Sequence, residues 1–137
     1  MFGVKAYAKV GVESQANAAS PHQLIVMLYD GLLESMRFAL AHMQAKDPLR
    51  KGNEISRALR ILQEGLVPAL DFEKGGDISV QLMGIYEYVS QHIVIASARN
   101  DEDKLKLCIG MIENIREAWM AIGSQALTQI SPQVAAP

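Results

Sequence analysis

The residues in this sequence that are best suited to acid–base or metal chemistry are three histidines and one pair of carboxylates. His22, His42 and His92 lack the i, i+4 spacing of a helical zinc site, and no Glu is followed by His three positions later, as a di-iron bundle requires. Asp30 and Glu34 do stand at i, i+4, but an exposed acidic helix face is far commoner than an acid–base pair. We therefore expect surface or capping histidines, solvated carboxylates, no metal or other cofactor, and a protein that is not an enzyme.

His42 and Lys46 keep one group-transfer alternative open. A phosphotransfer bundle needs an exposed histidine beside a cation that steadies the phosphate, and these two residues are spaced to share a helix face. His42, however, falls in the last turn of its predicted helix, whereas a phosphoryl-accepting histidine works best in the middle of an open face. A histidine phosphotransfer domain is nevertheless kept as an alternative function.

Composition narrows the class of protein further. The 137 residues suffice for one domain, and 50% of them are hydrophobic while 20% are charged, which favours a folded chain over a disordered one. The net charge of -2 provides no basic patch for nucleic acid or an anionic membrane. No apolar run approaches a bilayer span, and no signal peptide is evident. The single Cys108 is expected to be a buried, reduced thiol, so we predict a cytoplasmic protein without membrane insertion.

Apolar residues recur at steps of three and four in long blocks, which predicts helices. The first helix is expected at 21–46, because Ser20 and Gln23 can form a capping box around Pro21. The second is expected to start at Pro48 after an Asp47 cap, and Pro68 predicts a kink near 64–65 or an early end. Its outer face is predicted to carry Arg57, Arg60 and Gln63, with Ile61 and Val67 as apolar exceptions.

Two further helices complete the prediction. Gly75 and Gly76 are expected to stop the second helix, Asp77 to cap the third, and Asn100 to precede the acidic first turn of the fourth. We predict an all-α fold: an antiparallel up-down four-helix bundle over 20–122, a short N-terminal segment 1–19 packed on it, and a flexible tail at 123–137. The predicted core residues are Ile25, Leu28, Leu32, Met36, Ala39 and Met43 in the first helix, Ile55, Leu59, Leu62, Leu66 and Ala69 in the second, Ile78, Leu82, Ile85, Val89, Ile93 and Ala96 in the third, and Leu105, Cys108, Ile112, Ile115, Trp119 and Ile122 in the fourth.

Several helices carry a second apolar stripe that a single core cannot hide. Contiguous exposed apolar area usually marks a binding surface, and methionine suits a surface that must adapt to a helix. We predict a groove between the third and fourth helices, bordered by the first, that accepts an amphipathic partner segment. The second-stripe residues are Leu24, Met27, Gly31 and Phe38 in the first helix, Val80, Met83 and Val94 in the third, and Leu107, Met111 and Ala118 in the fourth.

The N-terminal segment offers a plug for that groove. Tyr7, Val10 and Val12 are apolar or amphipathic, while Gly3, Gly11 and Asn17 make a helix marginal there. The segment either covers the empty groove or is a frayed terminus with one incidental tyrosine.

Four motifs in a fixed order carry a family resemblance. Ala-Tyr at 6–7, S-P-H-Q-L-I-V-M-L-Y-D-G at 20–31, L-D-F-E-K-G-G-D-I at 70–78 and I-R-E-A-W at 115–119 resemble the successive motifs of the FliS family of flagellin-specific export chaperones. The likeness covers roughly residues 6–122, while Gly65 and Pro68 look atypical for the middle of a family helix.

The resemblance implies a non-catalytic helical bundle that binds the C-terminal segment of newly made flagellin in the cytoplasm. It implies that the chaperone prevents premature polymerisation and helps to pass flagellin to the flagellar type III export apparatus. It also implies that the N-terminal segment, with Tyr7, occupies the groove of the free protein. We expect a monomer or a weak homodimer. A generic helical adaptor or dimerisation bundle is the alternative, and a pull-down with a flagellin C-terminal peptide separates the two.

Overall fold

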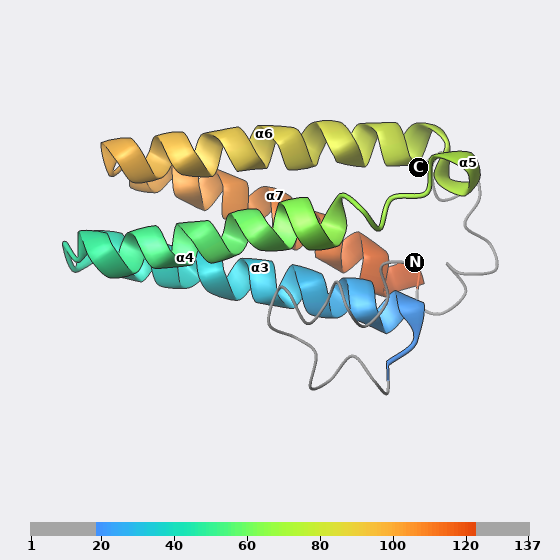
Figure 1. The fold of residues 1–137 in the computed structure, drawn as a ribbon, viewed down its shortest axis with the longest axis horizontal. Helices are drawn as coiled ribbons and strands as arrows, with labels where there is room; N and C mark the ends of the chain where they lie inside the picture. The colour runs from blue at the N-terminus through green and yellow to red at the C-terminus, as the bar shows by residue number, and fades with distance from the viewer. Residues whose placement is uncertain (1–18, 123–137) are drawn as a thin grey trace.

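The computed structural model describes residues 19–122, and this part of the chain folds into helices without any strand, as an all-α fold requires. Its long helices lie lengthwise beside one another, with α3 and α6 running in one direction and α4 and α7 in the other (Figure 1). α3 and α6 each pack along both α4 and α7, so α3 and α6 occupy opposite corners of the bundle. The helices are α3 (Pro21–Gln44), α4 (Pro48–Arg60), the π-helix η1 (Ile61–Leu66), α5 (Phe72–Gly75), α6 (Asp77–Arg99) and α7 (Glu102–Ile122).

α3 begins with the predicted capping box. Gln23 N donates to Ser20 Oγ at 3.1 Å and Ser20 N donates to Gln23 Oε1 at 2.9 Å, with Pro21 in the first turn. The helix ends at Gln44, two residues before the predicted end at position 46. Lys46 has a φ of 57°, a left-handed conformation that cannot continue a right-handed helix.

The second helix changes type before it ends. As predicted, Asp47 caps the start of α4, since its Oδ1 accepts from Arg50 N at 3.2 Å. Residues 61–66, however, form a π-helix, whose turns are wider than those of an α-helix. Val67 N donates to Leu62 O at 2.9 Å, and the helix stops before Pro68. Ile61, predicted on the outer face, is fully buried: its N–H still bonds to Arg57 O and Ala58 O, so it follows the buried Ala58 at α-helical spacing.

The close approach of α3 to η1 depends on Gly65. A Cβ at this position would lie 2.9 Å from Leu28 Cδ2, which is too short for two carbon atoms unless the leucine moves. Gly65 therefore allows η1 to pack directly on α3 at Leu28.

The link into α6 contains a short helix that was not predicted. Asp71 caps α5, since its Oδ1 accepts from Glu73 N at 3.0 Å and Lys74 N at 2.9 Å. The prediction that Asp77 caps the third helix is wrong: Asp77 is the first residue of α6, and Gly76 occupies the cap position with a φ of 49°. Glycine suits this conformation because it has no Cβ.

The link between α6 and α7 is short. Asn100 ends α6 in the left-handed conformation, which asparagine tolerates better than most residues. Asp101 Oδ1 then accepts from Lys104 N at 3.0 Å, so Asp101 caps α7. This link holds the C-terminal end of α6 beside the N-terminal end of α7.

Two tyrosines that the apolar stripes did not identify join the opposite helices in the core. The hydroxyls of Tyr29 on α3 and Tyr86 on α6 form a 2.5 Å hydrogen bond, and both side chains are buried. Burial raises the pKa of Tyr29 to about 12, although the hydrogen bond with Tyr86 lowers it. Burial also raises the pKa of Tyr86 well above its usual value. Both hydroxyls are therefore neutral at physiological pH.

Candidate partner-binding surface

The predicted site residues fall into several groups in the structure. Val80, Val94 and Leu107 are 61%, 45% and 55% exposed, and Ala118 is also exposed. Three methionines are partly buried, namely Met27, Met83 and Met111, and Met27 and Met111 pack against the core. Tyr7 lies outside the described residues.

Leu24 is not available at the surface, because it is only 8% exposed. Gly31, on the same predicted second stripe, is buried as well, whereas Phe38 is 48% exposed. α3 packs against both α4 and α7, so it needs a wider apolar sector than one stripe provides. α3 also does not border a site between α6 and α7, because it lies at the opposite corner from α6.

Met83 faces a different neighbour from the one predicted. It lines a hollow of about 340 Å³ with Gln63 of η1, with Val67 just after η1, and with Tyr86 and Glu87 of α6. Val80 and Val94 stand seven residues on either side of Glu87, so they follow the Glu87 stripe on this flank of α6. The three predicted α6 residues therefore lie away from α7.

A different flank of α6 faces α7. Lys104 Nζ donates to His92 Nδ1 at 3.1 Å, and Tyr88 stacks on His92 with ring centroids 3.9 Å apart. Because α6 and α7 are antiparallel, residues seven positions before His92 and seven positions after Lys104 lie at the same height along the two helices. Ile85 is thus level with Met111, and Ile78 is level with Ala118. We define the α6–α7 seam as Ile78, Ile85 and His92 of α6 with Lys104, Met111 and Ala118 of α7.

The α6–α7 seam is apolar along most of its length and only partly covered. Ile78, Ile85 and Met111 are half-buried and Ala118 is exposed, although Ile78 and Ile85 were predicted to belong to the core. In Figure 1 the two helices adjoin at the link after α6 and diverge toward the α5 end. The divergence explains why these side chains are not sealed between the two helices.

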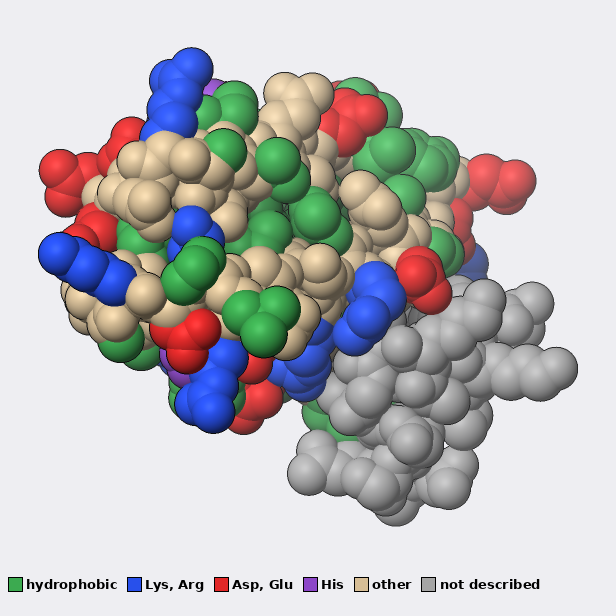
Figure 2. Space-filling model, turned by 60° about the vertical axis from the view of Figure 1, so that its left-hand side comes forward, with side chains coloured by type: hydrophobic (Ala, Val, Ile, Leu, Met, Phe, Trp, Pro, Cys, Tyr) green, Lys and Arg blue, Asp and Glu red, His purple; other side chains and the backbone are tan. Residues whose placement is uncertain are grey.

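Exposed apolar side chains also occur away from this seam. Figure 2 shows hydrophobic side chains in the middle and upper right of one face, with most of the visible Lys, Arg, Asp and Glu toward its margins. Phe72 of α5 is 53% exposed and Leu49 of α4 is 74% exposed. The sequence pattern thus correctly indicated surplus apolar surface, but that surface is spread over several flanks.

The other side of α7 is closed by polar contacts to α3. The rings of His22 and Trp119 stack with centroids 5.1 Å apart; Trp119 Nε1 donates to His22 O at 3.1 Å, and His22 Nε2 donates to Trp119 O at 2.9 Å. His22 is buried, so its prediction as a surface or cap residue is wrong. We define the α3–α7 seam as His22, Asp30, Arg37 and Gln44 of α3 with Glu102, Glu113, Arg116 and Trp119 of α7.

Ion pairs extend this closure along the helices. Arg116 Nε contacts Asp30 Oδ1 and Arg37 Nη2 contacts Glu113 Oε2, each at 2.5 Å. Asp30 is thus a partner of α7, while Glu34 contacts Arg57 Nη1 of α4 at 3.2 Å. The two carboxylates serve different helix contacts and do not form an acid–base pair.

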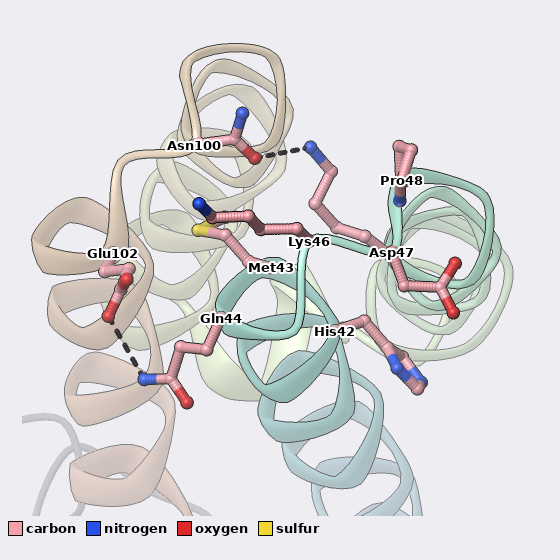
Figure 3. Close-up of a pocket in the computed structure, with 9 residues that line it drawn as sticks. His42, Met43, Gln44, Lys46, Asp47, Pro48, Asn100 and Glu102 are labelled. Carbon is pink, nitrogen blue, oxygen red and sulfur yellow. Dashed lines mark hydrogen bonds between the residues drawn. The ribbon is translucent and has the colours of Figure 1, made fainter.

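His42 and Lys46 line a cavity of about 470 Å³ at the end of the bundle that holds the interhelical links. Figure 3 shows their side chains projecting to opposite sides, because Lys46 lies beyond the end of α3. The geometry that a histidine phosphotransfer site needs is therefore absent from this pair. Lys51, in the same cavity lining, donates to Ser97 O at 2.7 Å and to Asn100 Oδ1 at 2.8 Å.

The structure also places two cations, one buried and one partly buried, against neighbouring helices, which the sequence did not reveal. Lys51 is 9% exposed and joins α4 to the C-terminal end of α6. Arg57, predicted on the outer face, donates from Nη1 to Gly31 O at 3.1 Å and to Ser35 Oγ at 2.6 Å. Long basic side chains can bury their stems while their charged ends find acceptors, which a helical wheel does not reveal.

Within residues 19–122, no cluster of three or more His, Cys, Asp or Glu side chains is placed to hold a metal ion. Cys108 is a free, buried thiol; burial raises its pKa, and the nearby Lys104 charge opposes that rise. None of the helices described combines the length and apolar character that crossing a membrane requires.

Comparison with known proteins identifies relatives over nearly the whole chain. The family described as "Flagellar protein FliS" matches residues 3–126. The flagellar secretion chaperone FliS of Salmonella typhimurium is 41% identical over 129 residues, covering 94% of this chain and 96% of its own. FliS of Escherichia coli is 35% identical, covering 85% and 86% of the two chains, and FliSB of Pseudomonas aeruginosa is 34% identical, covering 89% and 96%. These relatives are named flagellar secretion chaperones.

Proposed function

This chain belongs to the FliS family of flagellar secretion chaperones, and we propose that it binds the C-terminal segment of flagellin in the cytoplasm. Bound in this way, flagellin is kept from polymerising before export and is delivered to the flagellar type III export apparatus. The protein acts by binding and not by catalysis. The observation that carries the proposal is the half-covered apolar α6–α7 seam in a chain of this family.

The physical requirements of such a partner support a seam better than a deep pocket. A segment that becomes ordered on binding loses conformational entropy, and a long apolar track is needed to offset that loss. From the level of Ile78 to that of His92 the seam extends over fourteen residue-to-residue steps of helix, or about 21 Å. An amphipathic helix of similar length can place one apolar stripe along this track.

We further propose that residues 1–19 cover the same surface in the free protein, with Tyr7 as one contact. The segment would then compete with flagellin. Removing residues 1–17 is expected to maintain or raise the affinity for flagellin, because the bound segment no longer has to be displaced. A clear loss of affinity would show instead that these residues contribute contacts to flagellin.

Co-purification tests the proposed function directly. The chain is mixed with full-length flagellin and with flagellin that lacks its C-terminal segment, and each mixture is separated by size exclusion. We expect a complex with full-length flagellin only. Equal binding of both forms would favour a generic helical adaptor, and failure to bind either form would contradict the proposal.

A further inference from the structure

The α6–α7 seam ends in a cation whose hydrogen-bond partner is uncharged. Lys104 Nζ donates to His92 Nδ1 at 3.1 Å. A lysine ammonium can only donate, so His92 Nδ1 must accept, and the proton of the neutral imidazole lies on Nε2. A protonated His92 could not accept this bond and would repel Lys104.

The ammonium of Lys104 has more donors than its partners among the described residues use. It has three N–H groups, and within residues 19–122 the contact with His92 uses one of them. The ion pairs within residues 19–122 join Asp30, Glu34, Asp47 and Glu113 to arginines, and none of them includes Lys104. Lys104 is also only half-buried, so part of the residue stays open to a ligand.

The position of this cation relates it to the apolar track. Lys104, Met111 and Ala118 form one stripe of α7, so the charge stands at one end of a line of apolar side chains. A segment lying along Ile85 and Met111 therefore meets a positive charge where α6 and α7 come together. A carboxylate placed there would gain a charge-assisted hydrogen bond in a partly desolvated setting.

Resting on the proposed function, we infer that Lys104 binds an Asp or Glu side chain of the flagellin segment and that His92 holds the Lys104 ammonium in position. The apolar stripe supplies affinity along the seam, whereas the carboxylate sets the register and direction of the bound segment. Sliding the segment by one turn, or reversing it, would leave the carboxylate away from Lys104, so the contact discriminates between binding modes.

The test uses a flagellin C-terminal peptide and calorimetry. Lys104→Met removes the charge and keeps the length of the side chain. Lys106→Met is the matched control, because Lys106 is exposed and, two residues after Lys104, lies on a different side of α7 from the seam. We expect Lys104→Met to weaken binding about fivefold at low salt and less at high salt, and Lys106→Met to leave binding unchanged.

Peptide variants then identify the carboxylate. Each Asp or Glu of the peptide is changed to Asn or Gln in turn. One change is expected to weaken binding to the wild type about fivefold and to have no further effect on Lys104→Met, as coupled partners do. If Lys104→Met binds like the wild type, or if no peptide carboxylate is coupled to it, the inference is wrong. A peptide with an amidated C-terminus is tested as well. If only this change weakens binding, Lys104 contacts the terminal carboxylate and not an Asp or Glu side chain, and the inference is wrong.

Substitutions of His92 test its positioning role. His92→Leu removes the acceptor for Lys104, whereas His92→Gln retains one in its side-chain oxygen. We expect His92→Leu to bind the peptide more weakly than the wild type and His92→Gln to bind it about as tightly as the wild type. Equal affinities for the two variants would contradict the positioning role. If the wild type binds no flagellin peptide at all, the proposed function fails first, which separates that failure from a failure of this inference.

Discussion

The two sides of α7 meet their neighbours in different ways. Toward α3, the contact is fixed by the His22–Trp119 stack and by ion pairs spread along the helix. Toward α6, among the described residues one hydrogen bond near the link, between Lys104 and His92, precedes a line of half-buried apolar side chains. Directional bonds require defined partners and close a contact, whereas apolar stripes accept any surface of suitable shape. The α3–α7 seam is therefore suited to holding the fold and the α6–α7 seam to exchanging partners.

The largest expected effect comes from breaking the α3–α7 seam. Trp119→Ala removes the stack on His22 and one hydrogen bond, and we expect it to lower the free energy of unfolding by about 3 kcal/mol, measured by urea denaturation. Met120→Ala is the matched control because Met120 is 47% exposed, and it should cost little. Equal stability of the Trp119→Ala variant and the wild type would mean that this seam does not hold the fold.

A smaller effect is expected from the buried pair that joins α3 to α6. Tyr29→Phe leaves the Tyr86 hydroxyl buried without a partner, which should cost about 2 kcal/mol of unfolding free energy. Adding Tyr86→Phe should recover part of that loss, because no unpaired hydroxyl remains. If the double variant were instead less stable than Tyr29→Phe by about another 2 kcal/mol, this account would be contradicted.

The same pair gives a pH dependence of known sign. The pKa of Tyr29 is raised to about 12 in the fold, against about 10 in an unfolded chain. The neutral hydroxyl therefore contributes stability in full below pH ~10, and this contribution is lost as the pH rises toward about 12. The free energy of unfolding in urea should fall more over this pH interval for the wild type than for the double variant Tyr29→Phe, Tyr86→Phe. Parallel curves of this free energy against pH would contradict the prediction.

A substitution in the α6–α7 seam should alter binding more than stability. Met111→Glu places a charge in the half-buried apolar stripe, and we expect the affinity for the flagellin C-terminal segment to fall by more than about 1.4 kcal/mol, or tenfold, in calorimetry. Val94→Asp serves as the control, because Val94 is 45% exposed on another flank of α6. A larger loss from Val94→Asp than from Met111→Glu would move the binding surface to that flank.

The smallest effect is expected from a single exposed ion pair of the α3–α7 seam. Both side chains of the Arg37–Glu113 pair are about half exposed, so Arg37→Met should cost less than about 1 kcal/mol, and less still at high salt. Urea unfolding at two salt concentrations provides the measurement. A salt-independent loss of several kcal/mol would show that the ion pairs, and not the His22–Trp119 stack, dominate this seam.

Local signals in the sequence predicted the elements well. Ser20 with Gln23 and Asp47 mark helix starts in the structure as predicted, and Pro68 ends its helix early, one of the two outcomes expected. The core of α7 was also predicted well, since Leu105, Cys108 and Ile112 are buried. These features depend on neighbours within one or two turns, which is the information a sequence carries directly.

Features that depend on contacts between helices were missed. Ile61 is buried outside the stripe that its own helix predicted, and His22 and Lys51 are buried because their partners come from α7 and α6. The hydroxyl of Tyr86 likewise finds its partner on α3. No periodicity within a single helix indicates such pairings, because each requires knowing which helix lies beside which.

The sequence by itself determined that this chain forms helices with more apolar surface than one core can cover, and its motifs pointed to the family. The tertiary structure alone decided that Met83 turns toward the α4 side while Met111 lies along α6. The physical reason is that a helical wheel gives the angle between two side chains on one helix but not the neighbour that each flank meets. That neighbour depends on the order of the helices around the bundle, which only the assembled fold defines.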